Sequence, residues 1–162
     1  MVRVRCPGVK CRRIVATDSG ASPVNRAELR RLAEDRVFDA DMLLRGNRWS
    51  GAYYLAGYAV ECGLKACVLA FVERTGVIFQ DRKFLERCWT HDLEALVKAA
   101  DLEVTRGLDI SANPYLGANW QIVERWSELA RYQQWTEPQA RKLYEAVTES
   151  ANGVLPWVKV HW

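Results

Sequence analysis

From residue 25 onward, apolar side chains recur every three or four residues, which is the period of amphipathic helices. Asn25 precedes Glu28 by three positions and forms a loose capping box. The apolar positions that follow fall on one helix face: Leu29, Leu32, Ala33, Val37, Ala40 and Leu44. The pattern predicts a first helix that ends near Gly46 and Asn47.

The next segment, SGAYYLAGYAVECGLKACVLAF (residues 50–71), is apolar or small on nearly every side. Ser50 is its predicted N-cap, and Arg74, Thr75 and Gly76 form the stop signal, with Gly76 suited to the left-handed C-terminal position. Its small residues let neighbouring helices approach closely: Ala52, Ala56, Gly57, Ala59, Gly63 and Ala66. We expect this segment to be the central helix.

Three further helices are predicted. Thr90 caps the third, with a buried stripe of Leu93, Leu96, Val97 and Ala100. DISANPYLGAN (residues 109–119) is predicted to be a loop, and Asn119 opens a fourth helix with inward positions at Ile122, Val123, Trp126, Leu129 and Ala130.

Thr136 and Gln139 form a capping box for a fifth helix that should end near Gly153 and Pro156. The last residues, WVKVHW, are too short to classify. The sequence therefore predicts an all-α fold, an up-and-down bundle of four to five helices with short connections.

The basic charge of the chain lies in its first residues. The net charge of the 162 residues is +3, yet residues 14–162 carry 18 basic and 20 acidic side chains, because five cations without an acid precede them: Arg3, Arg5, Lys10, Arg12 and Arg13. Residues 1–24 have Pro, Gly and Ser but no sustained period, so we expect a flexible basic leader before a helical domain at 25–162. Such an arm either contacts nucleic-acid phosphates or is simply solvated.

Neither a membrane span nor a secretory signal is expected. Glu61, Lys65 and Glu73 interrupt the longest apolar run, and the N-terminus lacks an apolar stretch followed by a cleavage site. The five cysteines form no paired framework, as in a protein whose thiols stay reduced. We therefore expect a cytoplasmic protein.

The central helix keeps two charged residues in its middle. Glu61 and Lys65 have the order that favours an i,i+4 ion pair, and helix geometry puts Tyr54 and Tyr58 on the same stripe. A polar seam on a mostly buried helix is typical of an interface or a cleft. These four residues are therefore predicted to bind a ligand or to shape a cleft.

Several segments carry a resemblance to a known family. They are RRLAEDRVFDADMLLRGNRWSGAYYLAGYAVECGLKACVLA, then THDLEALVKAA, WSELARY and GVLPWV. Over roughly residues 26–158 the chain resembles the HEPN (higher eukaryotes and prokaryotes nucleotide-binding) domain family. The resemblance implies a dimer of helical bundles. Its members include metal-independent ribonucleases of toxin and phage-defence systems, and non-catalytic modules that bind nucleotides or accompany a nucleotidyltransferase.

The same resemblance points to Arg87 and His91 as catalytic residues. Catalytic members share an Arg and a His a few residues apart, and RCWTH is the nearest match, with three residues between the two, a shorter spacer than is usual in the family. His91 is suited to proton transfer and Arg87 to holding phosphate. The alternative is structural: His91 packs its ring and hydrogen-bonds a neighbour such as Glu61.

No metal and no cofactor are expected. Cys88 and His91 have the spacing of half a zinc site, but His161, the only other histidine, lies near the end of the chain. Phosphate-loop, dinucleotide and hydrolase motifs do not occur in the sequence. Two functions remain: a dimeric ribonuclease that acts on RNA, or a non-catalytic dimerisation or nucleotide-binding module that works with a nucleotidyltransferase or another effector chain.

Overall fold

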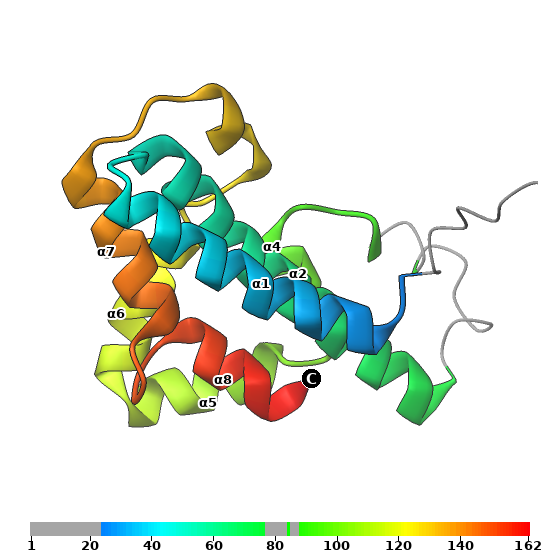
Figure 1. Cartoon of the computed structure of the whole chain (residues 1–162). Coiled ribbons are helices and arrows are strands. Elements are labelled where there is room, and N and C mark those ends of the chain that lie inside the picture. The colour runs from blue at the N-terminus through cyan, green and yellow to red at the C-terminus, as the bar shows by residue number, and fades with distance from the viewer. Residues whose placement is uncertain (1–23, 77–83, 85–87) are drawn as a thin grey trace, which may run out of the picture.

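The structure is a computed structural model, and it describes residues 24–76, 84 and 88–162 (Figure 1). The described part is helical and contains no strand. Its elements are α1 (Arg26–Arg45), α2 (Trp49–Thr75), α4 (Leu93–Ala99), α5 (Glu103–Ala112), α6 (Pro114–Val123), the 3-10 helix η2 (Glu128–Tyr132), α7 (Glu137–Thr148) and α8 (Val154–His161). The all-α class is confirmed. The expected four to five helices are too few, since seven α-helices occur in these residues alone. The predicted leader, apart from Val24, lies outside the described residues.

Helices α1 and α2 form a long antiparallel pair. Asn25 caps α1 as predicted, because its side chain accepts a hydrogen bond from Glu28 N at 3.0 Å. An ion pair of 2.7 Å joins Arg26 at the start of α1 to Glu73 near the end of α2. The predicted stop of α2 is also correct: Gly76 has a φ of 66°, in the left-handed region that glycine adopts without strain.

Helix α2 is the core of the bundle. Thirteen of its residues are buried, from Ala52 to Val68. By length and composition α2 is long and apolar enough to cross a membrane, with a mean hydropathy of 1.6 over its most apolar window. Because 61% of that window is buried inside the bundle, the same composition is explained by packing against other helices.

Two predicted N-caps are wrong. The N-cap of α2 is Arg48, two residues before the predicted Ser50, and Ser50 instead accepts a hydrogen bond from Trp135 N at 2.9 Å. Helix α4 is capped by Asp92, whose side chain accepts from the N–H groups of Glu94 and Ala95. The hydroxyl of Thr90 accepts a hydrogen bond from Asp92 N, just before the first residue of the helix. At α4 a second polar side chain takes the cap, whereas at α2 the N-cap is Arg48, which makes no side-chain capping hydrogen bond.

The predicted loop at residues 109–119 is also wrong. Helix α5 continues to Ala112, and Asn113 caps α6 by accepting hydrogen bonds from Tyr115 N and Leu116 N. The Asn-Pro pair is therefore a cap followed by a first-turn proline, rather than a loop signal. Asn119, predicted to open a helix, lies inside α6.

The end of the chain differs from the prediction beyond α7. The capping box of Thr136 and Gln139 is present, but α7 ends at Thr148, before Gly153. The unclassified C-terminal residues belong to α8, with Pro156 in its first turn. Helices α5 and α8 lie together on one side of the bundle, and residues 124–136 with η2 lie on the opposite side (Figure 1).

Two tryptophans fasten residues 124–136 to the start of α2. Trp126 Nε1 donates a hydrogen bond to the carbonyl oxygen of Tyr54 at 3.2 Å, and the Trp135 ring stacks on Tyr53 with centroids 3.6 Å apart. Trp126 lies so close to Gly57 that a Cβ there would meet its ring at 2.3 Å. Glycine at position 57 is therefore required for this contact, which holds η2 beside α2.

Candidate functional site

The polar seam of α2 is centred on a buried carboxylate. Glu61 is 1% exposed and is the only buried charged or polar side chain in the described residues. A buried carboxylate is costly unless it is paired. Two donors share its Oε1 atom: Lys65 Nζ at 2.7 Å and His91 Nδ1 at 2.9 Å.

His91 joins this cluster from the segment that leads into α4. It directly precedes Asp92, the cap of α4, so the turn that starts the helix also sets the imidazole against α2. The His91 side chain is 46% exposed. Because an ionised carboxylate only accepts, the neutral ring carries its proton on Nδ1 and its lone pair on Nε2, on the far side from Glu61.

The predicted contact between Glu61 and His91 is therefore present, and so is the predicted pair of Glu61 with Lys65. The arrangement suits two roles. It fastens the start of α4 to α2, and it fixes the orientation of a half-exposed imidazole, as a carboxylate does for a catalytic histidine. The second carboxylate oxygen, Oε2, is buried and has no hydrogen-bond partner among the described residues.

The tyrosines of the seam continue along α2. The rings of Tyr54 and Tyr58 are stacked, with 5.9 Å between centroids, and both side chains are half-buried. Burial raises the pKa of Tyr58, and the neighbouring Cys62 and Glu61 add to this effect. Burial likewise raises the pKa of the Cys62 thiol to about 11, so this thiol stays protonated near neutral pH.

Arg36 is a residue of the seam that the sequence analysis missed. It lies on α1 close enough to the Cys62 thiol to favour the thiolate electrostatically, and it pairs with Asp39 at 2.9 Å. The period of α1 predicts that Arg36 lies on the stripe that faces α2. The sequence does not predict that Cys62 of α2 lies near it.

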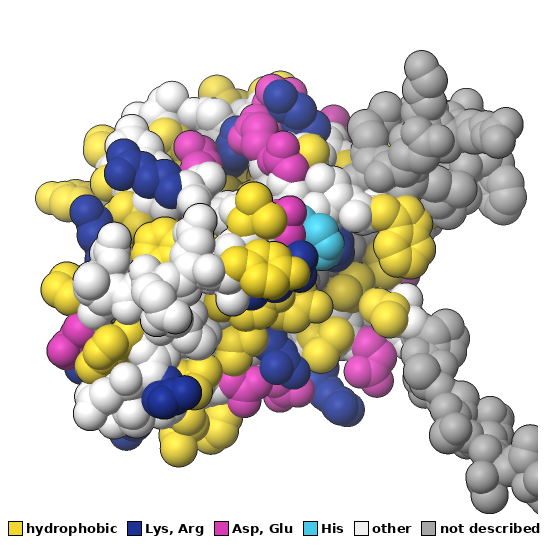
Figure 2. Space-filling view, turned by 90° about the horizontal axis from the view of Figure 1, so that it is seen from above, with side chains coloured by type: hydrophobic (Ala, Val, Ile, Leu, Met, Phe, Trp, Pro, Cys, Tyr) yellow, Lys and Arg dark blue, Asp and Glu magenta, His cyan; other side chains and the backbone are white. Residues whose placement is uncertain are grey.

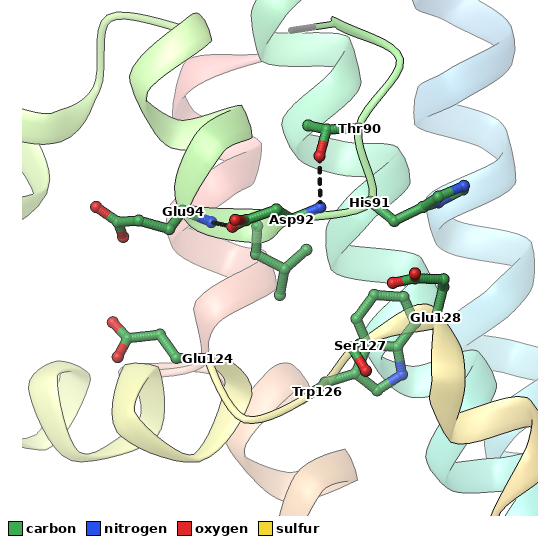
Figure 3. Close-up of a pocket in the computed structure, with 9 residues that line it drawn as sticks. Thr90, His91, Asp92, Glu94, Glu124, Trp126, Ser127 and Glu128 are labelled. Atoms are coloured by element: carbon green, nitrogen blue, oxygen red, sulfur yellow. Dashed lines mark hydrogen bonds between the residues drawn. The ribbon is translucent and has the colours of Figure 1, made fainter.

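A pocket of about 570 Å³ opens on the other side of His91 (Figure 3). It has four carboxylates in its walls: Asp92, Glu94, Glu124 and Glu128. Figure 3 shows Glu94 and Glu124 at one end and His91 with Glu128 at the other, with the His91 ring pointing away from Glu94. Arg106 neutralises part of this charge, at 2.6 Å from Glu94 and 3.8 Å from Glu124. The pocket is acidic and disfavours phosphate.

The surface around the site is mixed in character. Figure 2 shows a histidine side chain with acidic, basic and hydrophobic side chains immediately around it. No group of three or more His, Cys, Asp or Glu side chains that could hold a metal ion occurs in the described part of the chain. The four carboxylates of the acidic pocket therefore do not form such a group.

Of the six predicted site residues, the structure brings together Tyr54, Tyr58, Glu61, Lys65 and His91 along one side of α2. The sixth, Arg87, lies outside the described residues. Its pairing with His91 stays a prediction. Comparison of the chain with family models, with curated proteins and with solved structures finds no match.

Proposed function

We propose that the chain is a HEPN-type helical bundle that acts as a dimeric, metal-independent ribonuclease, with His91 as its proton-transfer group. The observation that carries the proposal is the contact of His91 Nδ1 with the buried carboxylate of Glu61 at 2.9 Å. This contact leaves Nε2 of a half-exposed ring for a substrate. An imidazole held in this way serves as a general base near neutral pH.

The reaction requires only groups of the chain. A base removes the proton of a ribose 2′-hydroxyl, and its oxygen attacks the adjacent phosphorus. The bond to the 5′-oxygen then breaks, and an acid returns a proton to that oxygen. The products are a 2′,3′-cyclic phosphate and a 5′-hydroxyl. In the proposed dimer, His91 of one protomer acts as the base and its counterpart as the acid, and Arg87 stabilises the charge on phosphorus.

The charges around His91 indicate how an RNA strand would approach. The pocket walls carry Asp92, Glu94, Glu124 and Glu128, which repel phosphate. Along α2, by contrast, the charges are balanced, because Lys65 pairs with Glu61, and Arg36 of α1, near the same turn, pairs with Asp39. We therefore propose that the strand follows the seam of α2 and leaves the acidic pocket empty.

The proposal is tested by incubating the purified protein with a mixed pool of tRNA and single-stranded RNA in the presence of a chelator. The expected result is cleavage to 2′,3′-cyclic phosphate ends, lost in His91→Ala and retained in His161→Ala, which removes the chain's other histidine. Circular dichroism and sizing of each variant establish that helicity and the dimer are unchanged. Absence of cleavage by the native dimer would refute the ribonuclease proposal.

A second candidate is a non-catalytic module that binds a nucleotide or accompanies a nucleotidyltransferase chain. It is favoured by the same hydrogen bond, since His91 also fastens α4 to α2. Under this alternative the native dimer cleaves no RNA. His91→Ala then weakens binding of a co-expressed nucleotidyltransferase partner, because it loosens the start of α4.

A further inference from the structure

Three tyrosines lie on α2 and on η2, which pack against each other. Tyr54 and Tyr58 lie one turn apart on α2, with 14° between their stacked rings. Tyr132 ends η2 and is 77% exposed. We call Tyr54, Tyr58 and Tyr132 the aromatic shelf. An exposed tyrosine of this kind contributes little to the core, so its ring is available to a ligand.

Arg131 joins the two parts of the shelf. Its guanidinium lies 5.0 Å from the centroid of the Tyr132 ring, and it is near enough to Tyr54 to interact with that side chain electrostatically. The same side chain is exposed to solvent. A cation is therefore held beside the aromatic rings while it remains accessible to a phosphate.

The shelf is carried by a fixed segment. Trp126, which is buried, donates its indole N–H to the carbonyl oxygen of Tyr54 and so ties the start of η2 to α2. Trp135 ties the other end of the segment to Tyr53. Because both ends are anchored on α2, Tyr132 is presented next to the seam in a defined position.

Cations continue from the shelf toward His91. Lys65 follows Tyr54 by eleven residues on α2, a rise of about 16 Å along a helix. Arg36 lies on the α1 side of the same stretch, near Cys62. Aromatic rings in line with cations are the arrangement that binds single-stranded nucleic acid, in which bases stack on the rings and phosphates meet the charges.

We propose that the aromatic shelf takes the unpaired nucleobases of single-stranded RNA, with Arg131 and Lys65 against its phosphates. This inference rests on the proposed function, because it names the substrate class of the same site. Bases in a duplex are covered on both faces by their neighbours, so they do not stack on a tyrosine of the protein. The shelf therefore selects single-stranded over base-paired RNA.

The test measures binding of a fluorescein-labelled single-stranded RNA oligonucleotide of mixed sequence, and of the same oligonucleotide annealed to its complement, by fluorescence anisotropy. All proteins carry His91→Ala, so that cleavage does not disturb the measurement. Tyr132→Ala is compared with Tyr132→Phe, which keeps the ring, and with Tyr115→Ala. Tyr115 is 74% exposed and lies near the start of α6, so it is a matched control.

The expected result is tighter binding of the single strand than of the duplex, and a loss of about fivefold or more in Tyr132→Ala, the lower end of the effect of removing one stacked base. Tyr132→Phe and Tyr115→Ala bind as the parent does. Equal losses in Tyr132→Ala and Tyr115→Ala, or equal binding of single strand and duplex, would overturn the inference. The two proposals can fail separately. If the native protein cleaves no RNA but binding of the single strand depends on Tyr132, the ribonuclease proposal is refuted and the proposal that the aromatic shelf binds RNA is supported.

Discussion

Glu61 Oε1 accepts hydrogen bonds from His91 Nδ1 at 2.9 Å and from Lys65 Nζ at 2.7 Å, although Glu61 itself is 1% exposed. One buried oxygen therefore connects two cationic or titratable groups at the surface. Because Lys65 lies on α2 itself and His91 precedes α4, only the histidine contact crosses between elements. The two partners should respond differently to mutation.

His91→Ala should leave the domain folded. Glu61 retains the Lys65 partner, so the substitution removes one hydrogen bond to a charged group without leaving the carboxylate unpaired. We expect the free energy of unfolding to fall by about 1.5–3 kcal/mol. Chemical denaturation followed by circular dichroism measures this change. A loss of helicity in native buffer would contradict the assignment of Lys65 as the sustaining partner.

Gly57→Ala should destabilise the fold through the contact with Trp126. A Cβ at position 57 would lie 2.3 Å from the indole ring, so the ring and the segment it anchors must shift. Overpacking of this kind costs about 1–3 kcal/mol. The matched control is Gly107→Ala on α5, where nothing lies within 4 Å of an added Cβ. We expect that variant to be more stable by about 0.4–1 kcal/mol.

The two variants are compared by thermal unfolding. A Gly57→Ala protein as stable as the Gly107→Ala protein would mean that Trp126 does not lie on α2 as described.

Cys62 and Cys67 should resist alkylation in the folded protein. Burial raises the pKa of Cys62 to about 11 and that of Cys67 to about 12, so little thiolate is present near pH 8, and both thiols are shielded. Iodoacetamide labelling followed by peptide mass spectrometry should find both unmodified until denaturant is added. Rapid labelling of Cys62 in native buffer would contradict the burial of this turn of α2.

His161 should make stability depend on pH. Burial lowers its pKa below the ordinary value of 6.5, although Asp109 opposes the shift. The unfolded chain therefore binds a proton more readily than the folded protein. The contribution of neutral His161 to the free energy of unfolding is complete above about pH 6.5. It is lost as the pH falls from about 6.5 through the lowered pKa of His161 in the folded protein.

The check is urea denaturation of the native protein and of His161→Gln at several pH values. The stability of the native protein relative to the variant should fall as the pH drops below about 6.5. A difference that is constant with pH would show that His161 titrates normally.

Helix ends with a single strong signal were predictable from the sequence. The Asn25 cap, the Thr136–Gln139 box and the left-handed Gly76 all depend on neighbouring residues alone, and all are present. The Glu61–Lys65 pair is also local, since both residues lie on one helix.

Features that depend on contacts between distant segments were not predictable. Residues 124–136 follow the surface of α2 because Trp126 reaches Gly57 and Trp135 reaches Tyr53, so the predicted fourth helix is interrupted after Val123. The hydrogen bond from His91 to Glu61 was foreseen as one of two alternatives, the one in which His91 fixes the third predicted helix to the second. The acidic pocket beside His91 was not, since its walls come from residues 90–94 at the start of α4 and from residues 124–128 between α6 and η2.

The central claim is that Glu61 orients His91 for catalysis, beyond fastening α4 to α2. The most direct test is the rate of RNA cleavage in chelator by Glu61→Gln, at a temperature where this variant and the native protein are both folded. The amide keeps the shape of the side chain but no longer fixes the proton on Nδ1. We predict a rate at least about 10²-fold below that of the native protein, the lower end of the contribution of a positioned general base. Cleavage at the native rate by the folded variant would contradict the claim and leave the pair with a structural role alone.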